Sequence, residues 1–186
     1  MKKLVTLMLI LAMVLCLGMA FATETEGEAA AEQTGAAEIN WADLEEKGAE
    51  MIAKGDFVTF DEIDLKMWIP KAMPAVELTD EDKSKGYIGY YRTEDESATI
   101  AVMYVNVNGM TLEEYKEKMI QAGATELQDV VINGMEGVSY ELKEKDTVGV
   151  SFVTEAGYIF EVVGAPKSDE GFAAILPFVM ASIQAK

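Results

Sequence analysis

The chain has 186 residues, a formal net charge of −18, one cysteine and no histidine. This length gives room for one domain with short accessory segments. So large a negative charge argues against nucleic acid and anionic membranes as partners, because both are polyanions. The lack of histidine excludes Ser-His-Asp and Cys-His catalysis and histidine-ligated zinc.

The first 22 residues have the pattern of a secretory signal peptide. Two lysines precede an apolar run from Leu4 to Leu17, and Ala20 to Ala22 form a small-x-small cleavage signal. We therefore expect cleavage after Ala22 and a secreted or extracytoplasmic protein that does not span the membrane in its mature form. Lipid anchoring through Cys16 is disfavoured, because Leu15 stands where a small residue is expected. Cleavage removes the only cysteine, so the mature chain has no thiol and no disulfide.

Residues 23–38 are rich in Glu, Ala, Gly and Thr and contain no large apolar residue. Such a segment cannot offset its ordering entropy by burial, which predicts a disordered acidic linker. Residues 39–186 then form a single domain.

Three helices are predicted in this domain, each from an apolar stripe at helical spacing after a capping residue. Their N-caps are Asn40, Thr111 and Ser168, and they run over residues 41–54, 112–122 and 169–183. Glu114 completes a capping box with Thr111. Pro177 lies inside the last stripe, which predicts a kink or a restart of the helix. The polar run from Thr79 to Lys85 is predicted to be a loop.

The plainest strand signal runs from Glu126 to Gly164, where β-branched and aromatic residues alternate with small or polar ones. Turns at Asn133-Gly134, Lys145-Asp146 and Ala156-Gly157 divide it into consecutive strands. Earlier strands are predicted at residues 57–60, 63–69 and 86–92. Residues 98–107 are nearly all apolar, which predicts a central strand covered on both faces. The sequence therefore predicts an α+β fold, an antiparallel sheet flanked by helices on both faces.

This order of elements resembles the PsbP-like (Mog/PsbP) family. The resemblance spans Phe57 to Ile183 and rests on Phe57–Phe60 with Leu65–Pro70, on Ile132–Tyr140 and on the helix Phe172–Ile183. It implies an α/β/α sandwich and a bacterial exported member of unassigned role. Family members bind partners, either as accessory subunits of photosystem II or by binding the Ran GTPase. The resemblance therefore implies a noncatalytic accessory or binding protein, and it assigns no role to particular residues.

Trp68 is the first candidate for a ligand contact. Strict alternation places it on the polar face of its predicted strand, where an indole is either covered by a helix or exposed as a stacking surface. In the exposed case, Tyr87, Tyr90 and Tyr91 extend a surface that suits a sugar, an aromatic ligand or a protein. The covered alternative is favoured, because the predicted fold places helices on both faces of the sheet.

Two acidic runs, residues 80–82 and 94–96, contain the oxygen ligands that calcium prefers. The EF-hand spacing fails at Lys85 and Tyr91, so we interpret these runs as solvated turns. The acids within residues 61–64 are too ordinary in so acidic a chain to indicate glycoside hydrolysis. Ser84 and Lys85 are adjacent in a loop, where a catalytic dyad rarely forms. We therefore expect no metal site, no cofactor and no enzymatic activity.

The signal peptide, the acidic linker and the lack of catalytic groups together predict an exported, noncatalytic binding or accessory module. Its partner would be a protein or a cell-envelope component. The alternative is a small-ligand or glycan-binding protein that uses an aromatic patch around Trp68. A carboxylate-based hydrolase is a third, weaker hypothesis.

Overall fold

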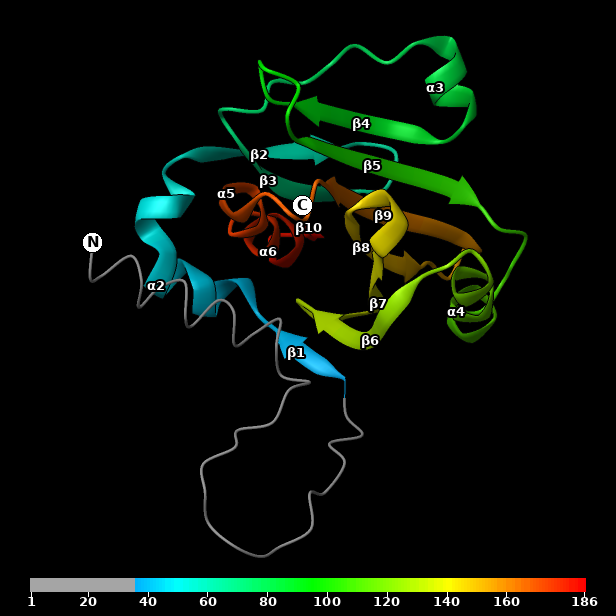
Figure 1. Ribbon diagram of the computed structural model, residues 1–186. Coiled ribbons are helices and arrows are strands. Elements are labelled where there is room, and N and C mark those ends of the chain that lie inside the picture. The colour runs from blue at the N-terminus through cyan, green and yellow to red at the C-terminus, as the bar shows by residue number, and fades with distance from the viewer. Residues whose placement is uncertain (1–35) are drawn as a thin grey trace, which may run out of the picture.

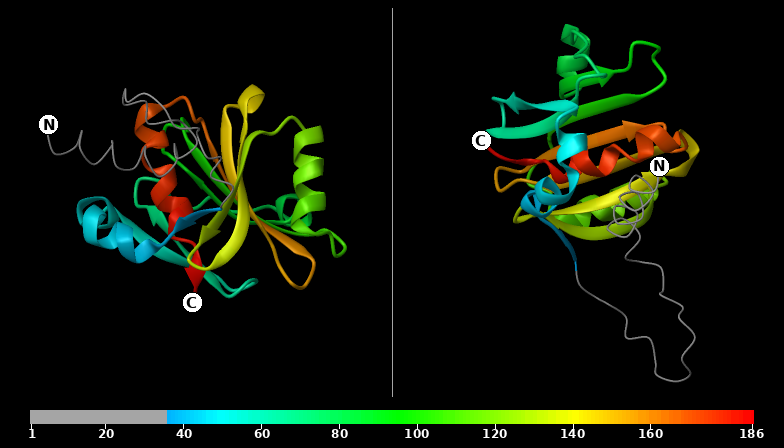
Figure 2. Two further views of the ribbon diagram at one scale, coloured as in Figure 1. Left: turned by 90° about the horizontal axis from the view of Figure 1, so that it is seen from below. Right: turned by 90° about the vertical axis from the view of Figure 1, so that its left-hand side faces the viewer.

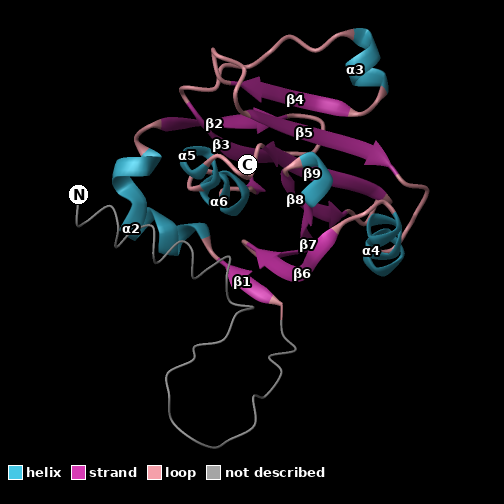
Figure 3. Ribbon diagram, in the orientation of Figure 1, coloured by secondary structure: helices cyan, strands magenta, loops and turns pink. Residues whose placement is uncertain are grey.

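The strands of the protein form two sheets (Figure 3). The computed structural model describes residues 36–186, so the predicted signal peptide and residues 23–35 of the predicted linker lie outside the described residues. The larger sheet has the strand order β1-β6-β7-β8-β9-β5-β4, and the smaller one has the order β10-β3-β2. The strands are β1 Ala37–Ile39, β2 Gly55–Phe60, β3 Leu65–Pro70, β4 Tyr87–Arg92, β5 Thr99–Asn106, β6 Thr125–Ile132, β7 Met135–Leu142, β8 Thr147–Val153, β9 Tyr158–Ala165 and β10 Gln184–Ala185.

The strands β6 to β9 form the antiparallel meander that the alternation between Glu126 and Gly164 predicts. Asn133, with a φ of 50°, and Asp146, with a φ of 51°, supply the left-handed backbone at two of its turns. Strand β5 pairs with β9 and β4 pairs with β5, both antiparallel. Strand β1 pairs parallel with β6, so Ala37 and Glu38 belong to the sheet and not to the predicted linker. The protein is therefore an α+β domain with mostly antiparallel sheets.

The helices pack on different parts of these sheets (Figures 1 and 2). Helix α4 packs on β7, where it shares an apolar cluster with Val138 and Tyr140. Helix α6 packs on β3 and contributes Phe178 and Val179 to the main core. Among the described residues, no helix is long and apolar enough to cross a membrane. The helices are α2 Trp41–Ile52, α3 Asp80–Ser84, α4 Leu112–Gln121, α5 Glu170–Ala173 and α6 Leu176–Ala181, with a 3-10 turn, η1, at Lys143–Lys145.

The predicted capping of these helices is partly correct. Thr111 and Glu114 form the expected capping box of α4. The final helix does restart, as α5 and α6, but its N-cap is Asp169, which accepts a hydrogen bond from the backbone N–H of Phe172 at 2.7 Å. Ser168, the predicted cap, instead donates its hydroxyl hydrogen bond to Asp146.

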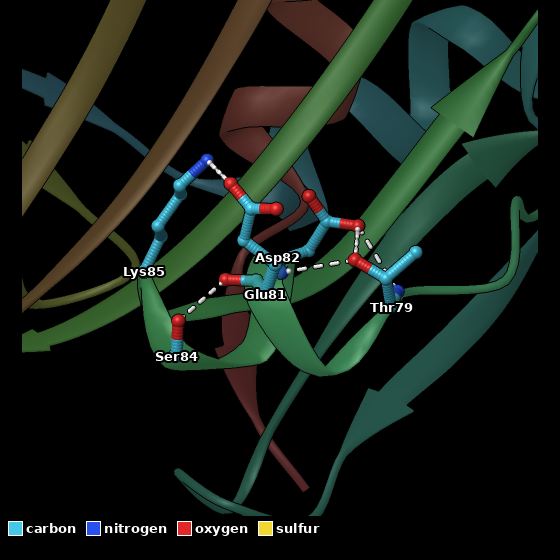
Figure 4. A network of polar contacts seen from close by, with 5 residues as sticks. All are labelled: Thr79, Glu81, Asp82, Ser84 and Lys85. Carbon is cyan, nitrogen blue, oxygen red and sulfur yellow. Dashed lines mark hydrogen bonds and ion pairs between the residues drawn. The ribbon is translucent and has the colours of Figure 1, made fainter.

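The segment from Thr79 to Lys85 is a short helix, α3, and not the predicted loop (Figure 4). The Thr79 hydroxyl accepts from the backbone N–H of Asp82 at 3.2 Å, and the Asp82 carboxylate accepts from the backbone N–H of Thr79 at 3.0 Å. This reciprocal pair is a capping box in which Asp replaces the usual Glu, so the start signal is weaker in the sequence.

Of the two faces of β5 that were predicted to be covered, the structure shows full burial on one. Ile100 and Val102 are fully buried in the main core, whereas Ala101 and Met103, on the opposite face, are half-buried and belong to neither apolar cluster. Helix α4 lies on β7, which is three strands and about 14 Å away. The Tyr115 side chain of α4 reaches Glu161 on β9, but neither Ala101 nor Met103 belongs to the apolar cluster that α4 forms with β7.

Candidate functional site

The part of the sheet beyond α4 presents two cross-strand rows of side chains on one face. The first row is Tyr90, Ala101 and Val163, and the second is Tyr87, Met103 and Glu161. All six residues are half-buried. We call these six residues on β4, β5 and β9 the tyrosine face.

A β-bulge brings the two tyrosines to the same face. Tyr87 and Tyr90 are three residues apart, and regular alternation would place them on opposite faces. The register shifts between Tyr87 and Gly89, so Tyr87 pairs with Met103 while Tyr90 pairs with Ala101, two residues earlier on β5. A bulge inserts one unpaired residue and re-aims the side chains that follow.

The other two aromatic candidates lie in the core. Trp68 is 1% exposed, and its indole N–H donates to the carbonyl of Ile52 at 2.9 Å. The alternative of an exposed Trp68 is therefore wrong, because β3 is the middle strand of the small sheet and packs between α6 and the rest of the core. Tyr91 is 6% exposed, and burial raises the pKa of its hydroxyl. Of the four predicted residues, the structure brings only Tyr87 and Tyr90 together on a partly open surface.

Glu161 is the last residue of the second row, and three hydroxyl groups bind its carboxylate. The sequence analysis did not predict this arrangement. Its Oε1 accepts hydrogen bonds from Tyr115 at 2.9 Å, from Tyr140 at 2.6 Å and from Ser151 at 2.8 Å. Ser151 is fully buried and Tyr140 is 3% exposed. Hydrogen bonds to an ionised oxygen are stronger than neutral ones. The three hydroxyls therefore replace hydrogen bonds that the carboxylate would otherwise make with water.

Each donor to Glu161 comes from a different element. Helix α4 supplies Tyr115, β7 supplies Tyr140 and β8 supplies Ser151. Gly149 makes room for the Tyr140 ring, because a Cβ at this position would lie 2.4 Å from the hydroxyl oxygen. The carboxylate therefore fastens the start of α4 to three neighbouring strands of the sheet.

Glu161 has no counter-charge among the side chains that the structure describes. Within residues 36–45 and 48–186, no lysine or arginine forms an ion pair with it. Lys116, the residue next to Tyr115, pairs with Asp129 and Glu113 instead. The site is thus a half-buried negative charge at the edge of an apolar and aromatic sheet face.

The hydroxyl network makes the unfolding free energy decrease as the pH rises above about 10. Burial, and then the charge of Glu161, raise the pKa of Tyr140 above its ordinary value near 10. The unfolded chain ionises this tyrosine first, so its contribution is complete below pH 10 and is lost as the pH rises through the folded pKa. We expect the unfolding free energy of Tyr140→Phe to fall less steeply above pH 10 than that of the wild type, by up to about 1.4 kcal/mol per pH unit.

This expectation can be checked by urea unfolding between pH 8 and 11. The control is Tyr104→Phe, because Tyr104 stacks on Tyr158 and its hydroxyl forms no hydrogen bond with the described residues. An equal slope for Tyr140→Phe and the wild type would contradict the assignment.

The acidic runs considered for calcium are bonded locally. Asp82 caps α3, and Glu81 pairs with Lys85 at 2.7 Å (Figure 4). Hydrogen bonds from the side chains of Ser97 and Thr93 lower the pKa of Asp95 to about 2. The described part of the chain contains no group of three or more acidic side chains placed to hold a metal ion.

Two hollows in the described part of the chain differ in size and lining. One, with a volume of about 30 Å³, lies among β1, β6 and α6 and is almost wholly apolar, so it has room for about one water molecule. The other, of about 460 Å³, lies beside α4 and is lined mainly by polar side chains, including Glu117 and Gln121. Neither hollow includes one of the aromatic candidates.

Comparison with known proteins identifies structures that share this fold. No protein-family model matches the chain, and no curated protein matches it. The solution structure of cyanobacterial PsbP (CyanoP) from Synechocystis sp. PCC 6803 matches with a TM-score of 0.51 and 12% identity, over 73% of this chain and 94% of that one. The Saccharomyces cerevisiae Ran-binding protein Mog1p matches with a TM-score of 0.40 and 12% identity, over 70% and 95% of the two chains. A mutant of Mog1 gives a TM-score of 0.41 at 11% identity, over the same shares of the two chains. The protein therefore has a PsbP-like fold, as its element order predicts.

Proposed function

We propose that the protein is a noncatalytic binding module that docks a protein partner on the tyrosine face. The observation that carries the proposal is a set of apolar and aromatic side chains on three adjacent strands that pack on neither apolar cluster. Aromatic residues and Met are enriched in protein interfaces, where they supply contact area at low entropy cost. Export directed by residues 1–22 belongs to the same proposal and would place the partner outside the cytoplasm.

The edge of β4 favours docking through side chains. The backbone N–H of Val76 donates to the carbonyl of Tyr90 at 2.8 Å, and that of Arg92 donates to the carbonyl of Pro74 at 3.2 Å. Residues 74–76 therefore occupy part of the edge where a partner strand would add. A partner would lie on the face of the sheet instead.

An open sheet face fits a protein surface better than it fits a small molecule. Small-ligand sites are usually concave and bury most of the ligand. Trp68, the residue on which a stacking site for a glycan depended, is buried. A glycan site would have to rest on Tyr87 and Tyr90 alone, and we keep it as an alternative outcome of the test.

The proposal is tested by photo-crosslinking in the cells that make the protein. A benzophenone amino acid at Tyr90 is expected to give a discrete crosslinked protein, which Met103→Lys should abolish. The control position is Ile120 on α4, which is 59% exposed and is not one of the six residues of this face. Identical products from both positions, or none from Tyr90, would overturn the proposal. Glycan binding that is lost in Tyr90→Ala, without a protein crosslink, would favour the alternative.

A further inference from the structure

We propose that Glu161 receives a lysine or arginine side chain of the protein partner, an inference that rests on the proposed function of the tyrosine face. The charge of Glu161 is half-buried and has no counter-ion among the described residues. Removing a carboxylate from water is costly unless it is both hydrogen-bonded and paired. The three hydroxyls meet the first requirement, and a cation from a partner meets the second.

The geometry of the carboxylate leaves one oxygen for such a cation. All three hydroxyl hydrogen bonds end on Oε1. Within residues 36–45 and 48–186, Oε2 accepts no hydrogen bond. A lysine ammonium or an arginine guanidinium donates only, so it complements an oxygen that can only accept.

The side chains next to Glu161 can contact the methylene groups of a bound lysine or arginine. Met103 and Tyr87 continue the row of Glu161, and Val163 lies beside them on β9. Long basic side chains lay their methylene groups along apolar surface while the charged end reaches a polar partner. The tyrosine rings add a favourable cation–π surface.

The charge of the whole chain favours the same kind of partner. A net charge of −18 attracts basic surfaces over a distance and speeds their encounter. Lys116, the residue next to Tyr115, does not compete for Glu161, since it pairs with Asp129. The partner is therefore a protein that presents a lysine or arginine among apolar residues.

The test uses two peptides that differ only in charge. The purified protein carries ¹³C-labelled Met and Val methyl groups, and the probes are acetyl-Leu-Lys-Leu-amide and the same peptide with norleucine in place of lysine. We expect the lysine peptide to shift the Met103 and Val163 signals saturably, with an affinity at least about tenfold above that of the norleucine peptide. Glu161→Gln should abolish this difference, because glutamine keeps an acceptor for the three hydroxyls but loses the charge.

Glu155→Gln is the matched control, since Glu155 is an exposed acid in the turn between β8 and β9. It should leave both affinities unchanged. Equal binding of the two peptides would overturn the role of Glu161 but leave the tyrosine face as a docking site. No response of Met103 or Val163 to either peptide would count against both. A saturable response to calcium chloride alone would make Glu161 an inorganic cation site and overturn the proposal.

Discussion

Replacing Asn133 by alanine is expected to lower the unfolding free energy by about 3–5 kcal/mol. The Asn133 side chain joins three distant parts of the chain. Its Nδ2 donates to the carbonyl of Ala181 at 2.8 Å and to that of Ile183 at 2.7 Å, while its Oδ1 accepts from the backbone N–H of Trp41 at 2.7 Å. Alanine would leave backbone groups of three buried residues without this partner, and each unmade bond costs about 1–3 kcal/mol.

Asn108 is a matched control for this substitution. It also begins an Asn-Gly turn, with a φ of 56° against 50° for Asn133, but it is exposed and its side chain forms no hydrogen bond with the described residues. Asn108→Ala should therefore cost only the strain of left-handed backbone, about 1–2 kcal/mol. Urea unfolding of both variants gives the comparison. Similar losses would show that the contacts of Asn133 add little beyond its turn.

Replacing Trp68 by alanine is expected to cost about 3–5 kcal/mol. The indole is fully enclosed, lies 6.4 Å from the ring of Phe178 between centroids, and donates to the carbonyl of Ile52. The substitution creates a large cavity and leaves that carbonyl without its donor. In a Trp41→Phe background, Trp68 emission should be blue-shifted and protected from acrylamide.

The two tryptophans provide their own control. The indole N–H of Trp41 is buried without a hydrogen-bond partner among the described residues, whereas that of Trp68 is bonded. Trp41→Phe should therefore cost less than Trp68→Phe in urea unfolding. Red-shifted, quenchable emission from Trp68, or a negligible cost of Trp68→Ala, would contradict its place in the core.

Local signals in the sequence predicted the meander and the cap of α4. Alternation with period two and the Asn133-Gly134 turn depend on neighbours in the chain, and so does the box of Thr111 and Glu114. The start of α2 shows where this reasoning fails. Asn40 occupies the N-cap position but makes no capping bond, and Asn133, 92 residues away, accepts from Trp41 instead. Local pattern cannot reveal a cap supplied by a distant turn.

The candidate site was harder to predict for the same reason. The hydroxyl donors of Glu161 lie 46, 21 and 10 residues from it in the sequence. The bulge near Tyr87 changes which side chains share a face, although the residues themselves look like an ordinary strand. One signal was available, since the run of residues 98–107 is nearly all apolar and both of its faces need cover. A partner protein can supply that cover as well as a helix of the same chain can.

The long-range contacts of α6 and β10 also constrain how the protein reaches its native state. Phe178 and Ile183 are core residues, and β10 completes the small sheet by pairing with β3, more than 110 residues earlier. Closing loops of this length is entropically costly and slows folding. We therefore expect the main core to close late in folding, when residues 176–185 meet β3.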